Sequence, residues 1–347
     1  MMSELSNITF SEACDILADA GDTLILTHMR PDADTLGSAF SLRTLLRGLG
    51  KRCEVANADE TIPRRLKFIF GTDSLRPELL PADFIPQTIV SVDVSAPKLL
   101  GDLEEEYAPK CALALDHHAL GTPFAAKTYV ADMGACGELI LDIFTEFKSR
   151  GSDLLTREAA GALYAAICSD TGSFKFESVT PETHHRIASL LMTGFNHAEI
   201  ARRLYDSRPI SQVMATKAAL NNLHFYNNNR VAVINFTQQM MADNNVSRED
   251  IDDIISLTRS IEGVEVGMSV KQSADDPNFF KVSMRSNRVA DVAKLCAVFG
   301  GGGHKRAAGC TLTAENEFAA EAALIEVIEK ELAELDAAGA FEGAGDI

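Results

Sequence analysis

The chain has 347 residues, of which 46% are hydrophobic and 24% charged, and its formal net charge is −18. This length and composition suit two folded domains, and the negative charge argues against a grip on long duplex nucleic acid, which needs a basic surface. No apolar run reaches the roughly eighteen residues of a membrane span, and the first residues lack a signal peptide pattern, so we expect a cytoplasmic protein without a membrane partner.

The first half of the chain alternates short apolar runs with amphipathic helical patterns, which is typical of an α/β domain. A helix also begins at Pro181, with Thr180 as its cap. The other elements predicted here are strands at residues 23–27, 52–56, 88–92 and 111–115, and helices at residues 36–49, 135–147 and 157–168. We therefore expect a parallel sheet covered by helices.

The pattern changes in the second half. Residues 187–222 read as helical, and the asparagines at 227–229 indicate a turn. The elements that follow are predicted as strands at 230–236, 264–270, 279–285 and 310–313, and as helices at 247–261, at 289–298 and from Glu315 onward. This order favours a smaller α+β domain. We divide the chain into an α/β domain over residues 1–186, a helical connector over 187–225 and an α+β domain over 226–347.

Ionisable side chains follow the predicted strands at the points where the strands end. They are His28 with Asp32 and Asp34 in the next loop, Asp93, the run Asp116, His117 and His118, and Asp170 after a helix. A single D-x-D pair is usually a turn, and a single Asp after a strand is commonly a helix cap. Ligands of open parallel sheets, however, bind beyond the carboxyl ends of the strands, so four such segments together predict one site.

Four aspartates and two histidines packed together would repel one another unless cations were bound. The mixture of carboxylate oxygen and imidazole nitrogen suits Mn²⁺, with Mg²⁺, Co²⁺ or Zn²⁺ as alternatives. One aspartate can bridge two ions at about 3.5–4 Å, and a hydroxide held between them would be the nucleophile.

A second pattern is the glycine-rich run FGGGGHKRAAG at residues 299–309. Consecutive glycines let backbone N–H groups approach an anion closely, and a histidine and two cationic residues follow at once. A flexible hinge would also use glycine but would not call for these neighbours. The sequence therefore favours a phosphate or nucleotide clamp, although the G-K-[ST] of a P-loop is absent.

These residues resemble the motifs of the DHH phosphoesterase superfamily, which is named for the tripeptide found here as Asp116-His117-His118. His28–Ser38 matches H-x-x-P-D-x-D-x-x-G-S, and Asp93 and the Asp170 of CSDTGSF complete the set. The stretch RSNRVADVAKLCAVFGGGGHKRAAG resembles the DHH-associated domain with its Gly-Gly-Gly-His motif. Within the superfamily, the length and the pair of domains are most similar to the nanoRNase (oligoribonuclease) and 3′-phosphoadenosine 5′-phosphate (PAP) phosphatase branch.

The resemblance implies a role for each matched residue. Two Mn²⁺ ions are expected, one held by His28, Asp32 and Asp93, and one held by Asp34, Asp93, His117 and Asp170, with Asp93 as the bridge. Asp116 would orient His117, and His118 would face the substrate phosphate as a charge stabiliser or proton donor. The residues expected to grip the far end of the substrate are Arg285, Ser286, Gly302, Gly303 and His304.

The expected function is hydrolysis of short single-stranded RNA, of PAP, or of both, by attack of a metal-held hydroxide on a substrate lying between the two domains. One alternative is a phosphodiesterase that uses the same residues to hydrolyse cyclic di-AMP or linear pApA. Another, of a different class, is a non-catalytic nucleotide sensor. The acidic C-terminal helix leaves a homodimer open, although its charge favours a solvated helix.

Overall fold

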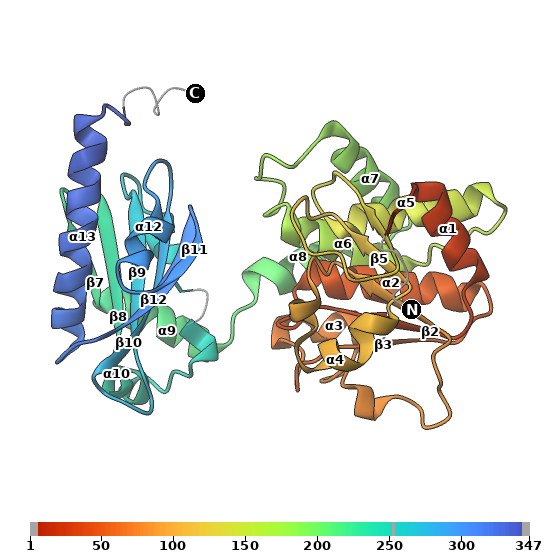
Figure 1. Cartoon of the computed structure of the whole chain (residues 1–347), viewed down its shortest axis with the longest axis horizontal. Helices are drawn as coiled ribbons and strands as arrows, with labels where there is room; N and C mark the ends of the chain where they lie inside the picture. The colour runs from red at the N-terminus through yellow and green to blue at the C-terminus, as the bar shows by residue number, and fades with distance from the viewer. Residues whose placement is uncertain (1–5, 252–253, 342–347) are drawn as a thin grey trace. The chain divides into compact units, whose positions relative to one another are not determined.

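The computed structural model describes residues 6–251 and 254–341, and the chain divides into two compact units, Met1–Ser207 and Arg208–Ile347 (Figure 1). The first unit is built on a six-stranded sheet in which every neighbouring pair is parallel. Its strands, in their order across the sheet, are β1 (Ser6–Asn7), β6 (Lys127–Val130), β5 (Leu113–Asp116), β4 (Thr88–Val92), β2 (Thr23–Leu26) and β3 (Cys53–Ala56).

Both faces of this sheet are buried, as parallel sheets require. Ile25 and Val90 belong to a core shared with the long helices on one face, whereas their neighbours Leu24 and Ile89 belong to a second core on the other face. The long helices are α1 (Phe10–Asp19), α2 (Ala33–Gly48), α5 (Cys136–Ser149), α6 (Arg157–Asp170) and α7 (Pro181–Leu191).

Shorter helices complete the first unit. The α-helices are α3 (Lys67–Phe70), α4 (Glu104–Tyr107) and α8 (His197–Ala201), and a π-helical turn, η5, spans Arg202–Asp206. The 3₁₀ segments are η1 (Arg64–Leu66), η2 (Pro77–Leu79), η3 (Pro97–Leu103) and η4 (Ala108–Lys110).

Helices α2, α5 and α6 meet at small residues. A Cβ atom on Gly37 of α2 would stand 2.4 Å from the carbonyl oxygen of Ala162 in α6, and a Cβ atom on Gly137 of α5 would stand 2.7 Å from the Cβ of Ala166. Only glycine allows so close an approach. Because α2 carries Asp34 and α6 ends at Asp170, this contact fixes how far apart the two carboxylates lie.

The second unit has a mixed six-stranded sheet in which only the pair β8–β9 is parallel. Its strands, in their order across the sheet, are β11 (Gly302–His304), β12 (Ala307–Thr313), β10 (Phe279–Ser286), β9 (Val266–Gln272), β8 (Val231–Phe236) and β7 (Leu223–Tyr226). Helices α12 (Val292–Ala297) and α13 (Glu317–Ala337) share a core with one face.

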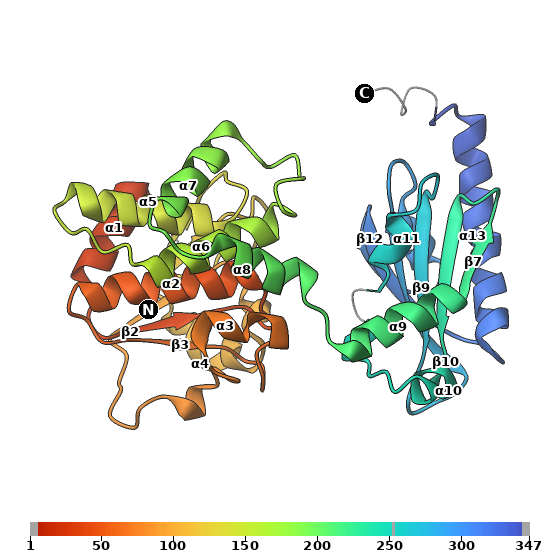
Figure 2. The ribbon, with the colours of Figure 1, turned by 180° about the vertical axis from the view of Figure 1, so that it is seen from behind.

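A separate core lies on the other face of this sheet, where Ile234 and Phe236 of β8 pack against α9 (Ile210–Asn221) and α10 (Gln238–Asp243) (Figure 2). The turn η6 (Glu249–Ile251) and α11 (Ser256–Arg259) follow in the chain. The expected combination of a parallel α/β domain and a smaller α+β domain is therefore confirmed.

Several predicted elements differ from those observed. Helix α2 begins at Ala33, three residues before the predicted start, because Asp32 caps it. The helix predicted at 247–261 is replaced, in its described part, by η6 and α11, and residues 252 and 253 lie outside the described residues. The connector over 187–222 is not one helix but the end of α7 followed by α8, η5 and α9. None of the helices in residues 6–251 and 254–341 combines the length and apolar character needed to cross a bilayer.

Candidate metal centre and nucleotide-binding residues

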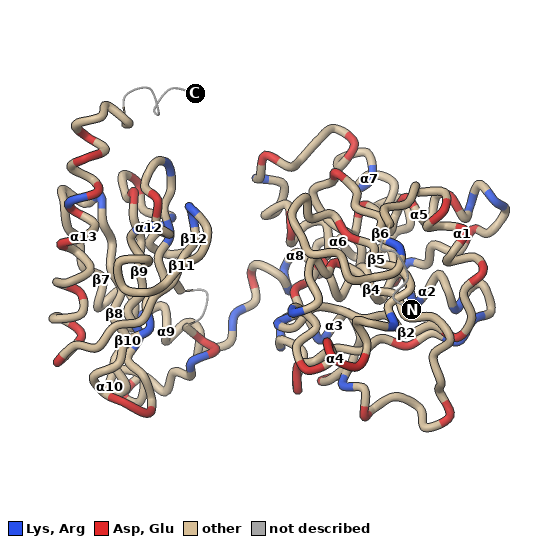
Figure 3. The backbone as a smooth tube through the Cα atoms, viewed as in Figure 1, with Lys and Arg blue, Asp and Glu red and all other residues tan. Residues whose placement is uncertain are grey.

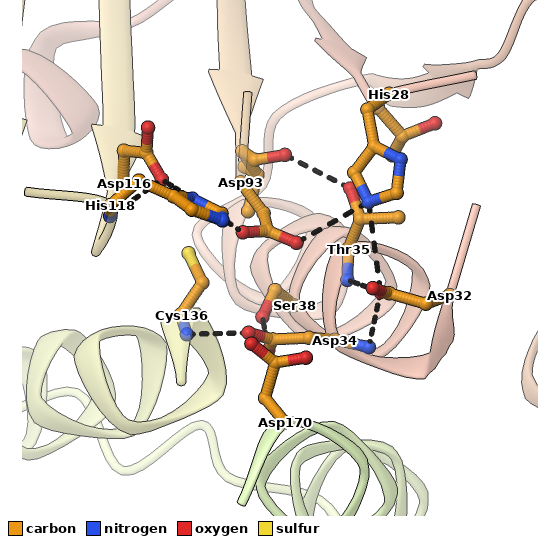
Figure 4. A network of polar contacts seen from close by, with 12 residues as sticks. His28, Asp32, Asp34, Thr35, Ser38, Asp93, Asp116, His118, Cys136 and Asp170 are labelled. Carbon is orange, nitrogen blue, oxygen red and sulfur yellow. Dashed lines mark hydrogen bonds and ion pairs between the residues drawn. The ribbon is translucent and has the colours of Figure 1, made fainter. Parts of the chain in front are cut away.

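The predicted ligands converge at the carboxyl edge of the parallel sheet (Figure 4). Within each of three groups, the ligand atoms lie within 4.8 Å of one another. The groups are His28, Asp32 and Asp93; Asp34, His117 and Asp170; and Asp93, Asp116, His117 and His118. The first two groups contain all six residues that the sequence predicts as metal ligands.

Asp93 lies between the two halves of this cluster. Its Oδ2 is 3.6 Å from Nε2 of His28, and its Oδ1 is 3.4 Å from Nε2 of His117. The residue is 2% exposed and has a φ of 60°, a left-handed conformation that costs a non-glycine residue about 1–3 kcal/mol. Its N–H donates to the Leu115 carbonyl at 2.9 Å, and the Thr35 hydroxyl donates to the carbonyl of Val92 at 3.0 Å. These two bonds hold the strained backbone.

Asp32 and Asp34 were predicted to share a loop, but only Asp32 precedes the helix. As the cap of α2, Asp32 accepts hydrogen bonds from the N–H groups of Asp34 and Thr35 at 2.9 and 3.0 Å. Asp34 lies in the first turn and is fully buried. Its Oδ2 accepts from the N–H of Cys136 at 2.6 Å, and its Oδ1 accepts from the N–H of Gly137 at 2.8 Å. The start of α5 thus stabilises the buried charge.

His117 and Asp170 complete the second group. Nε2 of His117 lies 3.3 Å from Oδ2 of Asp170 and 3.7 Å from Oδ2 of Asp34. Asp170 is the last residue of α6 instead of lying beyond it. Nδ1 of His117 lies 3.1 Å from the carbonyl oxygen of Met133, so a proton on Nδ1 leaves the lone pair of Nε2 directed at the cluster.

Asp116 contacts a different ring from the expected one. Its Oδ1 lies 2.8 Å from Nδ1 of His118 and accepts from the backbone N–H of His117 at 2.8 Å. The side chain of His117 takes the Met133 carbonyl instead. Asp116 therefore orients His118, whose side chain is 45% exposed.

The neighbouring charges shift the pKa values in this cluster strongly. Burial, followed by repulsion from Asp93, raises the pKa of Asp34 well above its usual range, and burial also raises the pKa of Asp170. Burial opposes the charged form of His28, but Asp32 and Asp93 outweigh it and raise the pKa of His28 to about 11. Burial likewise opposes the charged form of His117, but Asp170 and Asp93 outweigh it and raise the pKa of His117 to about 11. The cluster therefore holds protons that a bound cation would displace.

Two buried polar atoms of the cluster have no hydrogen-bond partner among the described residues, namely Oδ1 of Asp93 and Nε2 of His117. A buried polar atom without a partner costs about 1–3 kcal/mol, and a bound ion is one way to offset this cost. Carboxylate oxygen and imidazole nitrogen are donors that Mn²⁺ and similar divalent ions accept. The residues present thus fit a divalent metal.

In the second unit, the glycine run forms strand β11 beside β12. A Cβ on Gly301 would stand 2.3 Å from the Gly309 carbonyl oxygen, and one on Gly303 would stand 2.6 Å from the Ala307 carbonyl oxygen. A Cβ on Gly302 would have nothing within 4 Å. Two of these glycines are therefore required for close strand pairing, whereas Gly302 lies at an open surface.

Arg285 and His304 share one row across the sheet, because both pair with Ala307 of β12. Arg285 lies on the face opposite the core formed by Phe280 and Met284, since side chains alternate along β10. His304 is exposed.

Ser286 differs from these two residues because it is 1% exposed. Its hydroxyl donates to the Ala290 carbonyl at 2.7 Å. This hydroxyl is therefore committed to the turn that follows β10.

Comparison with known proteins identifies both units. The sequence model described as "DHH family, N-terminal domain" matches residues 22–167, and the model of the DHHA1 domain matches residues 228–333. The chain thus carries the N-terminal domain of the DHH family followed by a DHHA1 domain. The sequence-based identification of a DHH phosphoesterase with a C-terminal DHH-associated domain is thereby confirmed.

Curated relatives match along nearly their whole length. The bifunctional oligoribonuclease and PAP phosphatase NrnA of Thermus thermophilus is 29% identical, over 90% of this chain and 90% of the relative. The protein of the same name from Bacillus subtilis is 23% identical, over 85% of this chain and 91% of the relative. An exopolyphosphatase-related protein from Bacteroides fragilis shares the fold, with a TM-score of 0.80 and 23% identity over 94% of this chain and 96% of that one.

Sequence reasoning missed several residues that hold the ligands in place. Thr35, Ser38 and Met133 contact the predicted ligands or their backbone. Thr35 and Ser38 lie inside the H-x-x-P-D-x-D-x-x-G-S motif, so their positions were visible although their contacts were not. Met133 contacts His117 through its backbone carbonyl, and the type of a residue does not predict such a backbone contact.

Proposed function

We propose that this chain is a Mn²⁺-dependent phosphoesterase that hydrolyses short RNA oligonucleotides, PAP, or both, in the cytoplasm. The observation that carries the proposal is the convergence of six ligand side chains with Asp93 between the two groups. The relatives named oligoribonuclease and PAP phosphatase support the substrate class.

The two groups of ligands would each hold one cation. His28, Asp32 and Asp93 form one set, and Asp34, Asp93, His117 and Asp170 form the other. Bound there, two divalent ions would supply a water of lowered pKa as the nucleophile and would neutralise charge on the phosphate. Asp34 is fixed by two backbone N–H groups and His117 by a carbonyl, so the set is organised in advance.

His118 is suited to act on the substrate. Its Nδ1 faces Asp116, and this hydrogen bond raises the pKa of His118. The ring is 45% exposed, so Nε2 is accessible to a phosphate oxygen. We assign His118 as the proton donor to the leaving group or as a stabiliser of the developing charge, with Asp116 as its positioning residue.

The second unit would hold the other end of the substrate. Arg285 and His304 lie in one row of the sheet and offer two cationic or hydrogen-bonding groups, and Gly302 offers an uncovered backbone. Gly303 keeps β11 in place, and Ser286 supports the adjoining turn.

The test is hydrolysis of a panel of phosphoesters with Mn²⁺ and with Mg²⁺. The panel contains a dinucleotide RNA, PAP, cyclic di-AMP, pApA and polyphosphate. We expect turnover of the dinucleotide RNA, of PAP, or of both. Preferred turnover of cyclic di-AMP or pApA would replace the proposed substrate, and no turnover of any compound would favour a nucleotide sensor.

A pair of variants ties the turnover to the metal centre. Asp93→Ala should abolish it, whereas Asp153→Ala, which changes a carboxylate that is 64% exposed outside the cluster, should leave it intact. Both proteins should show the circular dichroism of the wild type. Full activity of Asp93→Ala would rule out its place between the two ions.

A further inference from the structure

The metal centre is open on one side. Asp34 and Asp93 are buried, but the side chains of Asp32 and Asp170 are 40% and 25% exposed. Within the described part of the first unit, a substrate phosphate can approach the cluster past these exposed groups and His118. Any surface that binds the rest of a substrate should adjoin Asp32 or Asp170.

A cationic surface of the first unit lies near Asp170, since the charges of Arg65 and Asp170 both act on Tyr205. We call it the cationic flank, and it consists of Arg64, Arg65, Lys67, Arg202 and Arg203. The backbone trace shows several Lys and Arg positions around α3 (Figure 3). Its two segments, η1 with α3 and the π-helical η5, are joined by the guanidinium of Arg203, which lies 5.4 Å from the ring centroid of Phe68.

The flank is anchored to the metal centre from two directions. Leu66 and Leu204 pack in one apolar cluster with Ala33 and Leu36, which flank Asp34 in helix α2. On the other side, the hydroxyl of Tyr205 donates to the carbonyl of Cys168 at 2.6 Å, two residues before Asp170.

Acidic neighbours cancel only part of the charge of the flank. Glu199 pairs with Arg202 at 2.8 Å and with Arg203 at 2.7 Å, and Asp73 pairs with Lys67 at 2.6 Å. Arg64 is exposed and makes no ion pair within residues 6–251 and 254–341. In a chain with a net charge of −18, the exposed guanidinium of Arg64 is therefore open to an anion.

The ring of Tyr205 adds a second recognition element. Its hydroxyl is held by Cys168, so the ring has a fixed position, and 39% of the residue is exposed. Aromatic rings beside cationic side chains are the usual platform for single-stranded nucleic acid, because any base can stack on them. The π-helical turn that carries Tyr205 is a form of backbone often found at functional sites.

We propose that Arg64, Arg65 and Tyr205 form a subsite for the RNA backbone and base beyond the scissile phosphate. This inference rests on the proposed function and extends it, because it makes the first unit itself selective for chain length. PAP is a single nucleotide and should not need the flank. An RNA of five nucleotides carries further phosphates and should bind to it.

The test compares the double variant Arg64→Gln/Arg65→Gln with a matched control, Lys110→Gln/Lys148→Gln. The control removes the same charge from side chains that are 60% and 64% exposed, with Lys110 on the amino side of β5. We expect kcat/KM for a five-nucleotide RNA to fall about tenfold in the flank variant, mainly through KM, with PAP unchanged. The dependence of log kcat/KM on log salt should become shallower by about 1.4, which is about 0.7 for each lost phosphate contact.

Three results would overturn the subsite. They are equal losses on PAP and RNA, an unchanged salt dependence, and an equal effect of the control variant. Tyr205→Ala should also weaken the RNA selectively, whereas Tyr205→Phe keeps the ring and should retain most of the affinity. Thermal melting of each variant checks that it is folded.

A binding measurement separates this proposal from the proposed function. Fluorescence anisotropy with a phosphorothioate-linked five-nucleotide RNA and Mn²⁺ needs no turnover. RNA binding that the flank variant weakens would support the subsite even if the protein hydrolysed none of the panel. A wild-type protein that does not bind the RNA, or one whose flank binds only a protein partner and leaves RNA affinity unchanged in the variant, would refute it.

Discussion

Replacing Thr35 by valine should loosen Asp93 without touching any ligand. The Thr35 hydroxyl donates to the carbonyl of Val92 at 3.0 Å, and both residues are fully buried. Valine has nearly the same shape, so the substitution removes one hydrogen bond and leaves the buried carbonyl of Val92 without this donor. That loss costs about 2 kcal/mol. The left-handed backbone of Asp93 stores a strain of similar size, so the weakened tether should let the loop relax.

Two measurements follow for Thr35→Val. Without metal, a cost of about 2 kcal/mol in a unit of this size lowers the melting temperature by about 4–8 °C. The affinity for Mn²⁺, measured by calorimetry, should fall about tenfold, because about 1.4 kcal/mol of the relaxation must be reversed on binding.

Thr35→Ser is the matched control, since it keeps the hydroxyl and should retain most of the affinity for Mn²⁺. If Thr35→Val bound Mn²⁺ as tightly as Thr35→Ser, the tether would have no role in placing Asp93.

Three further predictions concern the metal centre and the glycine strand. Adding Mn²⁺ at about a hundred times its dissociation constant should stabilise the first unit by about 2.7 kcal/mol in thermal melts, and Asp93→Ala should remove this shift. The affinity for Mn²⁺ should rise from pH 6 to pH 9, because the ion must displace protons from Asp170 and His117. Burial raises the pKa of Asp170, and the pKa of His117 is raised to about 11 by Asp170 and Asp93, which outweigh the opposing effect of burial. Calorimetry in buffers of different ionisation enthalpy should detect the released protons, and an affinity that does not change with pH would contradict this. Gly301→Ala should separate β11 from β12 and raise KM for PAP; an unchanged KM would show that β11 does not position the substrate.

Three of the predicted ligands, His28, Asp93 and His117, could be placed because each follows a buried strand. Buried parallel strands read as apolar runs, and β4 has the predicted bounds, so Asp93 was placed correctly at its end. The parallel order then brings the ends of separate strands to one edge. The place of the candidate site therefore followed from local pattern and one topological rule.

The hydrogen-bond partners within the site were less accessible to prediction. Asp116 was expected to orient His117 but contacts the ring of His118. Nδ1 of His117 has the Met133 carbonyl as its partner instead. Asp34 was placed in a loop because the apolar spacing of α2 only becomes evident at Leu36. A cap residue that is also a predicted ligand hides the true start of a helix.

Short edge strands were missed for a different reason. Strand β1 has only two residues, too few to show an alternating pattern. The glycine strand β11 has no side chains in its first two positions, so it carried no strand signal at all. Such strands are defined by their neighbours in the folded sheet and not by their own residues.

The glycine contact between α2 and α6 bears on which ion the centre accepts. Ca²⁺ prefers oxygen ligands at about 2.3–2.6 Å, whereas smaller ions such as Mg²⁺ prefer about 2.0–2.1 Å. To lengthen its bonds, a large ion would have to pull the two helices apart and open a gap beside Gly37 and Ala166, where no side chain could fill it. Selection by ionic radius would then come from helix packing. Gly37→Ala, which wedges the helices apart, should shift the ratio of affinities toward Ca²⁺.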